Sequence, residues 1–206
     1  MYKYETHLHS SPVSACAGAS VREHMEFYKS KGYDGIFITN HFIDGNICHD
    51  IRNGHSYEEM IEYYFSDYEE AKKLEREIGI KVFCGVESSY SGTDFLIYGL
   101  DKEWYLSHPE IREMRYSDFL RFLCDNGALV IQAHPFREAG YIDHIRLFPR
   151  SNLTSIFIKA ALSARSYKRS LIKRDATKSA LDRILKSQSA PQKQLCTHSR
   201  CGISKS

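Results

Sequence analysis

The chain has 206 residues, 42% of them hydrophobic and 26% charged, which is typical of a soluble globular domain with a full core. No stretch approaches the length of an apolar membrane-spanning helix, and the first residues lack the apolar segment of a signal peptide. We therefore expect a cytoplasmic protein without a membrane partner. Its six cysteines are widely spread and are expected to be free thiols rather than a disulfide framework.

The net charge of +2 conceals a division of the chain at about residue 150. Residues 1–150 hold 16 Lys and Arg against 24 Asp and Glu, whereas residues 151–206 hold 12 against 2. Every glutamate, and all but two of the 25 Phe and Tyr residues, precede residue 151. We therefore expect a globular domain over residues 1–150 and a basic tail rich in Ser, Lys and Arg over residues 151–206.

The first 150 residues alternate between segments typical of strands and segments typical of helices. Three amphipathic stretches predict helices, at residues 19–32 with Ser20 as the cap, at 56–77, and at 117–127 with Gly127 as the stop. The expected strands are YKYETHLH, DGIFITNH, KVFCGVES, TDFLIYGL and ALVIQAHP, at residues 2–9, 34–41, 81–88, 93–100 and 128–135. Repeated strand–helix units with short links predict a parallel α/β fold.

The ends of four expected strands carry residue types that bind metals. His7 and His9 are two apart in the first strand, so their side chains would point to the same face. His41, Glu87 and His134 end three later strands. In parallel α/β barrels the carboxyl ends of the strands meet at one mouth. A solvated rim is the alternative, but this set of residue types favours a site for several metal ions.

The motifs HLHS, ITNH, GVE and AHP, in this order and spacing, resemble the PHP (polymerase and histidinol phosphatase) family, in particular its small stand-alone members. The resemblance covers roughly residues 4–150. It implies a distorted (β/α)7 TIM-like barrel, up to three divalent metal ions and hydrolysis of phosphoesters. By position, His7 and His9 would bind one metal, Glu87 would bridge to a second held by His134, and His41 would bind the third. Catalysis would then depend on His7, His9, Glu87 and His134.

Two further residues are assigned less directly. The family usually supplies another ligand after the bridging glutamate, and Asp94 is the candidate here, with His108 a weaker one and a simple turn residue the alternative. Arg137 follows AHP in an expected strand-to-helix loop, where it would either bind a substrate phosphate or be a solvated charge. Imidazole and carboxylate ligands suit Zn, Mn and Fe alike.

The sequence also departs from the family pattern. Cys16 stands where the family often has Asp or His, and we expect a small buried thiol there rather than a soft ligand. The family's late Asp-x-His pair has no counterpart after residue 150. The cluster of Cys196, His198 and Cys201 is ascribed to chance, since a second ligand pair at zinc-finger spacing is absent. We therefore expect a barrel that is incomplete after about residue 150.

The composition of the tail allows two interpretations. Our hypothesis is that the coding sequence shifts frame near codon 150 or is degraded there. A basic extension that binds nucleic acid through phosphate contacts is the less favoured alternative, because the tail lacks interleaved aromatic residues.

Three functions are considered on these grounds. The first is a metal-dependent phosphoesterase in which metal-activated water attacks a small phosphomonoester, a nucleotide or a nucleic-acid end. The second is another HxH-barrel hydrolase that cuts amide or ester bonds, which His41 at the second strand end argues against. The third is a non-catalytic remnant with partial metal binding. The substrate, the metal and the oligomeric state are left open by the sequence.

Overall fold

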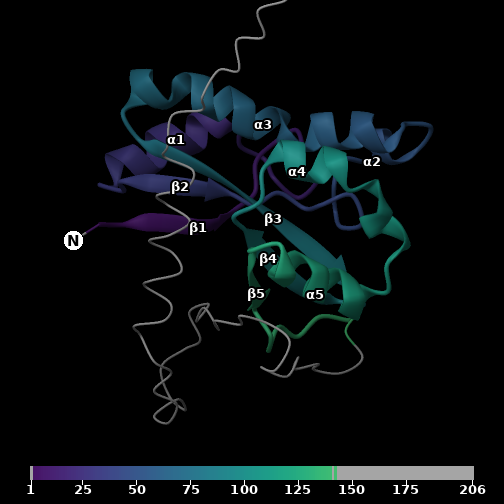
Figure 1. The fold of residues 1–206 in the computed structure, drawn as a ribbon. Helices are drawn as coiled ribbons and strands as arrows, with labels where there is room; N and C mark the ends of the chain where they lie inside the picture. Colours follow the sequence, from purple (N-terminus) through teal and green to yellow (C-terminus); the bar gives the residue numbers. More distant parts are fainter. Residues whose placement is uncertain (1, 141, 143–206) are drawn as a thin grey trace, which may run out of the picture.

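The computed structural model describes residues 2–140 and residue 142. The basic tail and the Cys196, His198 and Cys201 cluster lie outside the described residues. Five strands form one sheet in the order β1-β2-β3-β4-β5 (Figure 1). The strands are β1 (Tyr4–Leu8), β2 (Gly35–Ile38), β3 (Lys81–Tyr90), β4 (Thr93–Tyr98) and β5 (Leu129–Ala133). Each corresponds to a segment expected to be a strand, and β3 continues two residues beyond the expected end at residue 88.

The sheet is mixed rather than parallel, so the expectation of an all-parallel fold is wrong at β4. β1, β2 and β3 pair in parallel, whereas β4 is antiparallel to both β3 and β5. The cause is the link from β3 to β4, which consists of Ser91 and Gly92, with φ angles of 47° and 79°. Positive φ at both positions is the geometry of a tight hairpin turn, whereas a parallel connection needs a long crossover.

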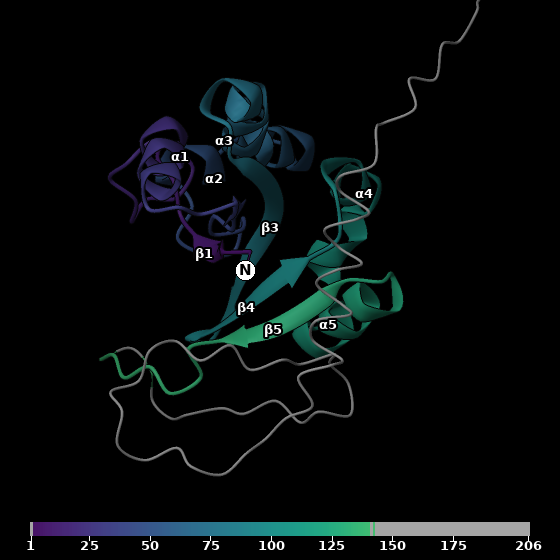
Figure 2. The ribbon, with the colours of Figure 1, turned by 90° about the vertical axis from the view of Figure 1, so that its left-hand side faces the viewer.

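The sheet curls through about half of a barrel, and the helices lie on one face of it, which we call the outer face (Figure 2). The described residues thus form a mixed α/β half-barrel, and the complete seven-stranded barrel implied by the resemblance is not seen in them. The helices are α1 (Val21–Ser30), α2 (His49–Arg52), α3 (Tyr57–Ile78), α4 (Lys102–Ser107) and α5 (Tyr116–Asp125), with the 3-10 helix η1 (Pro109–Glu113). In the described part of the chain, none of them is long and apolar enough to cross a membrane.

The three expected helices are α1, α3 and α5, and local signals explain two of their starts. Ser20 and Ser56 each cap a helix and form a capping box with Glu23 and Glu59, respectively. Gly79 ends α3 in the left-handed conformation, with a φ of 73°. Helices α2 and α4 and the helix η1 are short and were not expected. Their lengths are too small for a hydrophobic periodicity to be read from the sequence.

The core lies on both faces of the sheet. On the outer face, two clusters join the strands to α1, α3 and α5. The other face, which we call the inner face, carries one cluster of buried residues, made of Phe37, Phe83, Leu96, Tyr98, Leu129, Ile131 and Ala133. Because side chains alternate along a strand, Gly85, Glu87 and Ser89 follow Phe83 on this inner face. The inner face is therefore apolar at one end and polar at the other.

An irregularity in β1 sets the direction of its histidines. Tyr4 packs against the inner cluster, so strict alternation would turn Leu8 to the same face. The register between β1 and β2 shifts between Glu5 and Leu8, and Leu8 packs into the outer core beside α1. His7 and His9 flank Leu8 and thus point to the inner face.

Close packing at Gly85 gives a test of this arrangement. A methyl group there would lie 2.7 Å from a ring carbon of Tyr98 and 2.9 Å from the methyl group of Thr39. We expect Gly85→Ala to lower the free energy of unfolding by about 1–3 kcal/mol, because the core would be overpacked. Urea denaturation followed by circular dichroism measures this. Gly18→Ala is the control, since a methyl group at Gly18 meets nothing within 4 Å, and equal effects of the two substitutions would contradict the packing described.

Candidate metal centre

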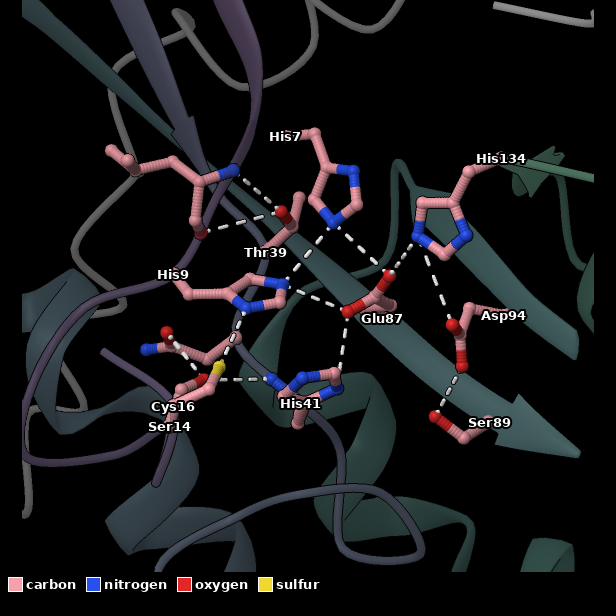
Figure 3. Close-up of polar contacts among 12 residues, drawn as sticks. His7, His9, Ser14, Cys16, Thr39, His41, Glu87, Ser89, Asp94 and His134 are labelled. Carbon is pink, nitrogen blue, oxygen red and sulfur yellow. Dashed lines mark hydrogen bonds and ion pairs between the residues drawn. The ribbon is translucent and has the colours of Figure 1, made fainter. Parts of the chain in front are cut away.

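The residues at the polar end of the inner face converge on one carboxylate, that of Glu87 (Figure 3). Its Oε1 lies 3.0 Å from Nε2 of His7 and 3.3 Å from Nε2 of His134. Its Oε2 lies 2.8 Å from Nε2 of His9 and 3.0 Å from Nδ1 of His41. The structure thus brings together side chains from β1, the ends of β2 and β5, and β3.

The Glu87 side chain is only 1% exposed, yet neither of its oxygens has a hydrogen bond of acceptable geometry. Nδ1 of His41 is likewise buried without a hydrogen bond. Buried carboxylates normally accept several hydrogen bonds, because removing a charge from water is costly. Here, nitrogens lie at contact distance but do not point a hydrogen at the carboxylate. Such a set of converging electron-pair donors fits a bound cation.

The ionisation states support the same interpretation. Burial raises the pKa of Glu87, but the adjacent His134, His7 and His9 outweigh burial and hold that pKa well below its usual range. Burial lowers the pKa of His41 to about 4, although the charge of Glu87 raises it. At neutral pH the site therefore holds an ionised carboxylate and a neutral His41 imidazole, which are the protonation states that metal ligands require.

Within the described residues, potential ligands form three overlapping groups, in each of which the ligand atoms lie within 4.8 Å of one another. Glu87 belongs to two of these groups and His9 to two. The groups are His7, His9 and Glu87; Glu87, Asp94 and His134; and His9, Cys16 and His41. These clusters fit divalent metal binding.

Asp94 joins the site because β4 is antiparallel. The start of β4 lies beside the ends of β3 and β5, and Asp94 pairs in register with Ser89 and with Ala133. Oδ1 of Asp94 accepts a hydrogen bond of 2.6 Å from the Ser89 hydroxyl, and Oδ2 lies 3.7 Å from Nε2 of His134. A residue at the start of a strand thus reaches the same edge as residues at the ends of the others.

Arg137 lies next to this carboxylate. One guanidinium nitrogen is 2.8 Å from Oδ2 of Asp94, so the side chain is engaged in an ion pair rather than simply solvated. The backbone turns sharply before it, because His134 has a φ of 27° and its carbonyl accepts a hydrogen bond from the Arg137 amide. Positive φ is strained for a non-glycine residue and often marks functional sites.

Two of the sequence-based assignments turn out differently. His108 is not among the clustered residues: its Nδ1 is 2.7 Å from the carbonyl of Trp104, and its ring stacks on the Trp104 indole. The expectation of a buried Cys16 is wrong, because the structure exposes this residue and places its Sγ 3.2 Å from Nδ1 of His9. Cys16 lies in the loop between β1 and α1, and the sequence pattern did not predict the conformation of this loop.

A buried polar network behind the histidines was not predicted. The amide of Asn40 accepts hydrogen bonds from the Ser10 backbone and the Ser14 hydroxyl, at 2.7 and 2.9 Å, and donates one to Asp67 at 3.1 Å. The Ser10 hydroxyl donates to Asp67 at 2.7 Å, and the Ser14 hydroxyl accepts from the backbone of His41 at 3.0 Å. This network ties the loops that carry His9 and His41 to α3. Its sequence signals were Ser10 and Asn40, each of which stands beside a proposed ligand in the HLHS and ITNH motifs.

A comparison with solved structures identifies a protein that shares the fold of this chain. A two-domain protein from Bacteroides vulgatus, which contains a predicted PHP-like metal-dependent phosphoesterase, matches 72% of this chain with a TM-score of 0.51 and 17% identity. The match spans 39% of that protein's length. A candidate metal-dependent phosphoesterase from Bifidobacterium adolescentis matches 66% of this chain and 69% of its own with a TM-score of 0.37 and 12% identity, too weak a likeness for any argument.

No family model matches the chain, and no curated protein matches its sequence. At 17% identity, the likeness to the Bacteroides protein shows a shared fold. The solved structure that shares this fold is thus one described as containing a PHP-like phosphoesterase.

The polar network gives a prediction of its own. In Asp67→Ala, the buried side chains of Ser10 and Asn40 would each lose a hydrogen-bond acceptor. We expect the free energy of unfolding to fall by about 1–3 kcal/mol, the cost of unpaired buried donors. Urea denaturation measures the change. Ser66→Ala, one residue earlier on α3, removes only an exposed hydroxyl that bonds the Tyr63 carbonyl; a loss no larger than in this control would rule out a supporting role for Asp67.

Proposed function

We propose that this chain is a metal-dependent phosphoesterase that hydrolyses a phosphomonoester or a phosphoester of a nucleotide or nucleic acid. The observation that carries the proposal is the buried Glu87 carboxylate, which lies within 2.8–3.3 Å of four imidazole nitrogens and has no well-formed hydrogen bond. The fold shared with a PHP-like protein supports the same kind of chemistry.

The proposal assigns up to three divalent ions, Zn, Mn or Fe, to the clustered residues. His7 and His9 would hold one ion, His134 and Asp94 a second, and Glu87 would bridge the two, while His41 would hold a third. Bound divalent metals supply a water whose pKa is near 7 and neutralise charge on the phosphoryl oxygens.

The residues of the chain prepare the site for this chemistry. The Glu87 carboxylate stays ionised although it is buried, and its low-dielectric surroundings strengthen its interaction with any cation. The Ser89 hydroxyl donates to Asp94 and so orients that carboxylate rather than acting as a nucleophile. Arg137 holds a positive charge at the edge of the site, where it would bind a phosphate oxygen on exchanging its contact with Asp94.

The first prediction from this proposal concerns metal content and turnover together. We expect purified protein to contain tightly bound divalent metal and to hydrolyse an activated phosphomonoester when manganese or zinc is added. His7→Ala should lower both, with turnover reduced by at least about a hundredfold, since even the loss of an outer-shell partner of a metal ligand costs about 10–100-fold. Elemental analysis and product release measure the two quantities.

His55→Ala is the matched control, because this exposed histidine contacts only Glu59 among the acidic residues of the described part of the chain. It should retain metal and activity. Protein that binds metal but turns over neither phosphoesters nor amide or ester substrates would be a non-catalytic remnant, and the proposal would be wrong.

A second prediction separates the two roles open to Arg137. Arg137→Gln removes the charged guanidinium group and its N–H donors. We expect KM for the phosphomonoester to rise about 10–100-fold, which corresponds to the loss of about 1.5–3 kcal/mol of binding free energy from a charged hydrogen bond. Metal content should not change. If the variant instead loses metal with KM unaltered, Arg137 serves to hold Asp94 and does not contact substrate.

A further inference from the structure

The loop between β1 and α1 places the thiol of Cys16 beside the histidine cluster, next to His9. Sγ of Cys16 is 3.2 Å from Nδ1 of His9, and Cys16, His9 and His41 offer ligand atoms within 4.8 Å of one another. Figure 3 shows Cys16 beside His9, on the side away from His7. The two nitrogens of His9 therefore face different groups: Nε2 faces Glu87 and His7, and Nδ1 faces the thiol.

The position of this thiol is fixed by the backbone around it. The amide of Ala15 donates to the carbonyl of Asn46, and the amide of Ala17 donates to the carbonyl of Ser14, at 2.9 and 3.1 Å. Ser14 also forms a β-bridge with Ile47. Cys16 thus lies between Ala15, which is bonded to the loop after β2, and Ala17, which is bonded to Ser14 in the same loop as Cys16. The approach of Sγ to His9 is a consequence of this folded loop.

A second observation indicates that this corner is suited to a cation. Oε2 of Glu87, which is almost completely buried and has no well-formed hydrogen bond, lies 2.8 Å from His9 and 3.0 Å from His41. An unpaired anionic oxygen is therefore directed between the same two histidines that Cys16 adjoins. Nδ1 of His41 is also buried without a hydrogen bond. Cys16 adds a sulfur to a corner that already has excess electron-pair donors.

We propose that Cys16 is a thiolate ligand of a divalent metal ion bound with His9 and His41, and that this position consequently prefers zinc to manganese. The inference rests on the metal site of the proposed function. On binding, the thiol transfers its proton to water and its sulfur bonds to the metal. His9 would bind this ion through Nδ1 and the ion shared with His7 through Nε2, so its ring would also give up its N–H proton to water and bridge the two ions as an imidazolate. Thiolate is a soft ligand that suits zinc, whereas oxygen ligands suit manganese. The thiol therefore makes this position chemically different from the two groups that contain Glu87.

Cobalt(II) substitution tests the proposal without relying on activity. A cobalt–thiolate bond gives an intense charge-transfer absorption in the near ultraviolet, whereas imidazole and carboxylate ligands give only weak visible bands. The full chain is titrated with cobalt(II) in a Cys196→Ser, Cys201→Ser background, so that the tail thiols contribute nothing. We expect the charge-transfer band to appear, to be lost in Cys16→Ser, and to persist in Cys48→Ser, which alters a thiol on the neighbouring loop.

The outcomes distinguish this inference from the proposed function. Visible cobalt bands without a charge-transfer band would mean that the thiol only hydrogen-bonds to His9, which overturns the inference and leaves the metal site intact. Absence of any cobalt binding would overturn both. Cys16→Asp gives an independent measurement: we expect its affinity for zinc relative to manganese to fall at least about tenfold, the low end of the effect of losing even an outer-shell partner. An unchanged ratio would contradict the proposal.

Discussion

The fold of this chain places the anionic side chain of Glu87 at a buried position of the kind that apolar residues normally occupy. Glu87 lies on the inner face of β3, on the same side as Phe83 and Gly85, and is almost fully buried. Burying an unpaired carboxylate costs several kcal/mol. The imidazoles at contact distance offset this cost only in part, because they do not donate well-formed hydrogen bonds. A cation would remove the imbalance, so the geometry of the histidines is better explained by a metal than by mutual hydrogen bonding.

The two-residue hairpin between β3 and β4 is the second constraint, and it determines which residues accompany Glu87. Because Ser91 and Gly92 reverse the chain, β4 begins at the edge where β3 ends. Asp94 then lies in register with Ser89 on one side and Ala133 on the other, directly before His134. A parallel β4 would carry Asp94 to the opposite edge of the sheet. The antiparallel strand is therefore what allows a strand-start residue to join four strand-end histidines.

Part of the fold and of the site could be predicted from the sequence. The strands and the capped helices follow from local patterns, because periodicity and caps act over a few residues. The proximity of His7, His41 and Glu87 follows from their positions at or near the ends of parallel strands. The direction of β4 depends on the two-residue turn of Ser91 and Gly92, a local hairpin signal that prevails over the general alternation of strands and helices. The exposure of Cys16 and the network around Asn40 depend on contacts between loops and α3, which a single sequence does not specify.

The arrangement of the candidate ligands would give a bound metal a structural role besides the proposed chemical one. Apart from Cys16, the candidate ligands lie on the five strands or within three residues of a strand end, so a metal held among them would connect strands that are not neighbours, such as β1 and β5. A ligand that binds only the folded state at a concentration of about 100 times its Kd adds about 2.7 kcal/mol to stability. That is a large share of the roughly 5–15 kcal/mol typical of a domain. The same ions that would activate water would therefore hold the curled sheet together at its polar edge, where the histidines and the buried carboxylate otherwise weaken the core.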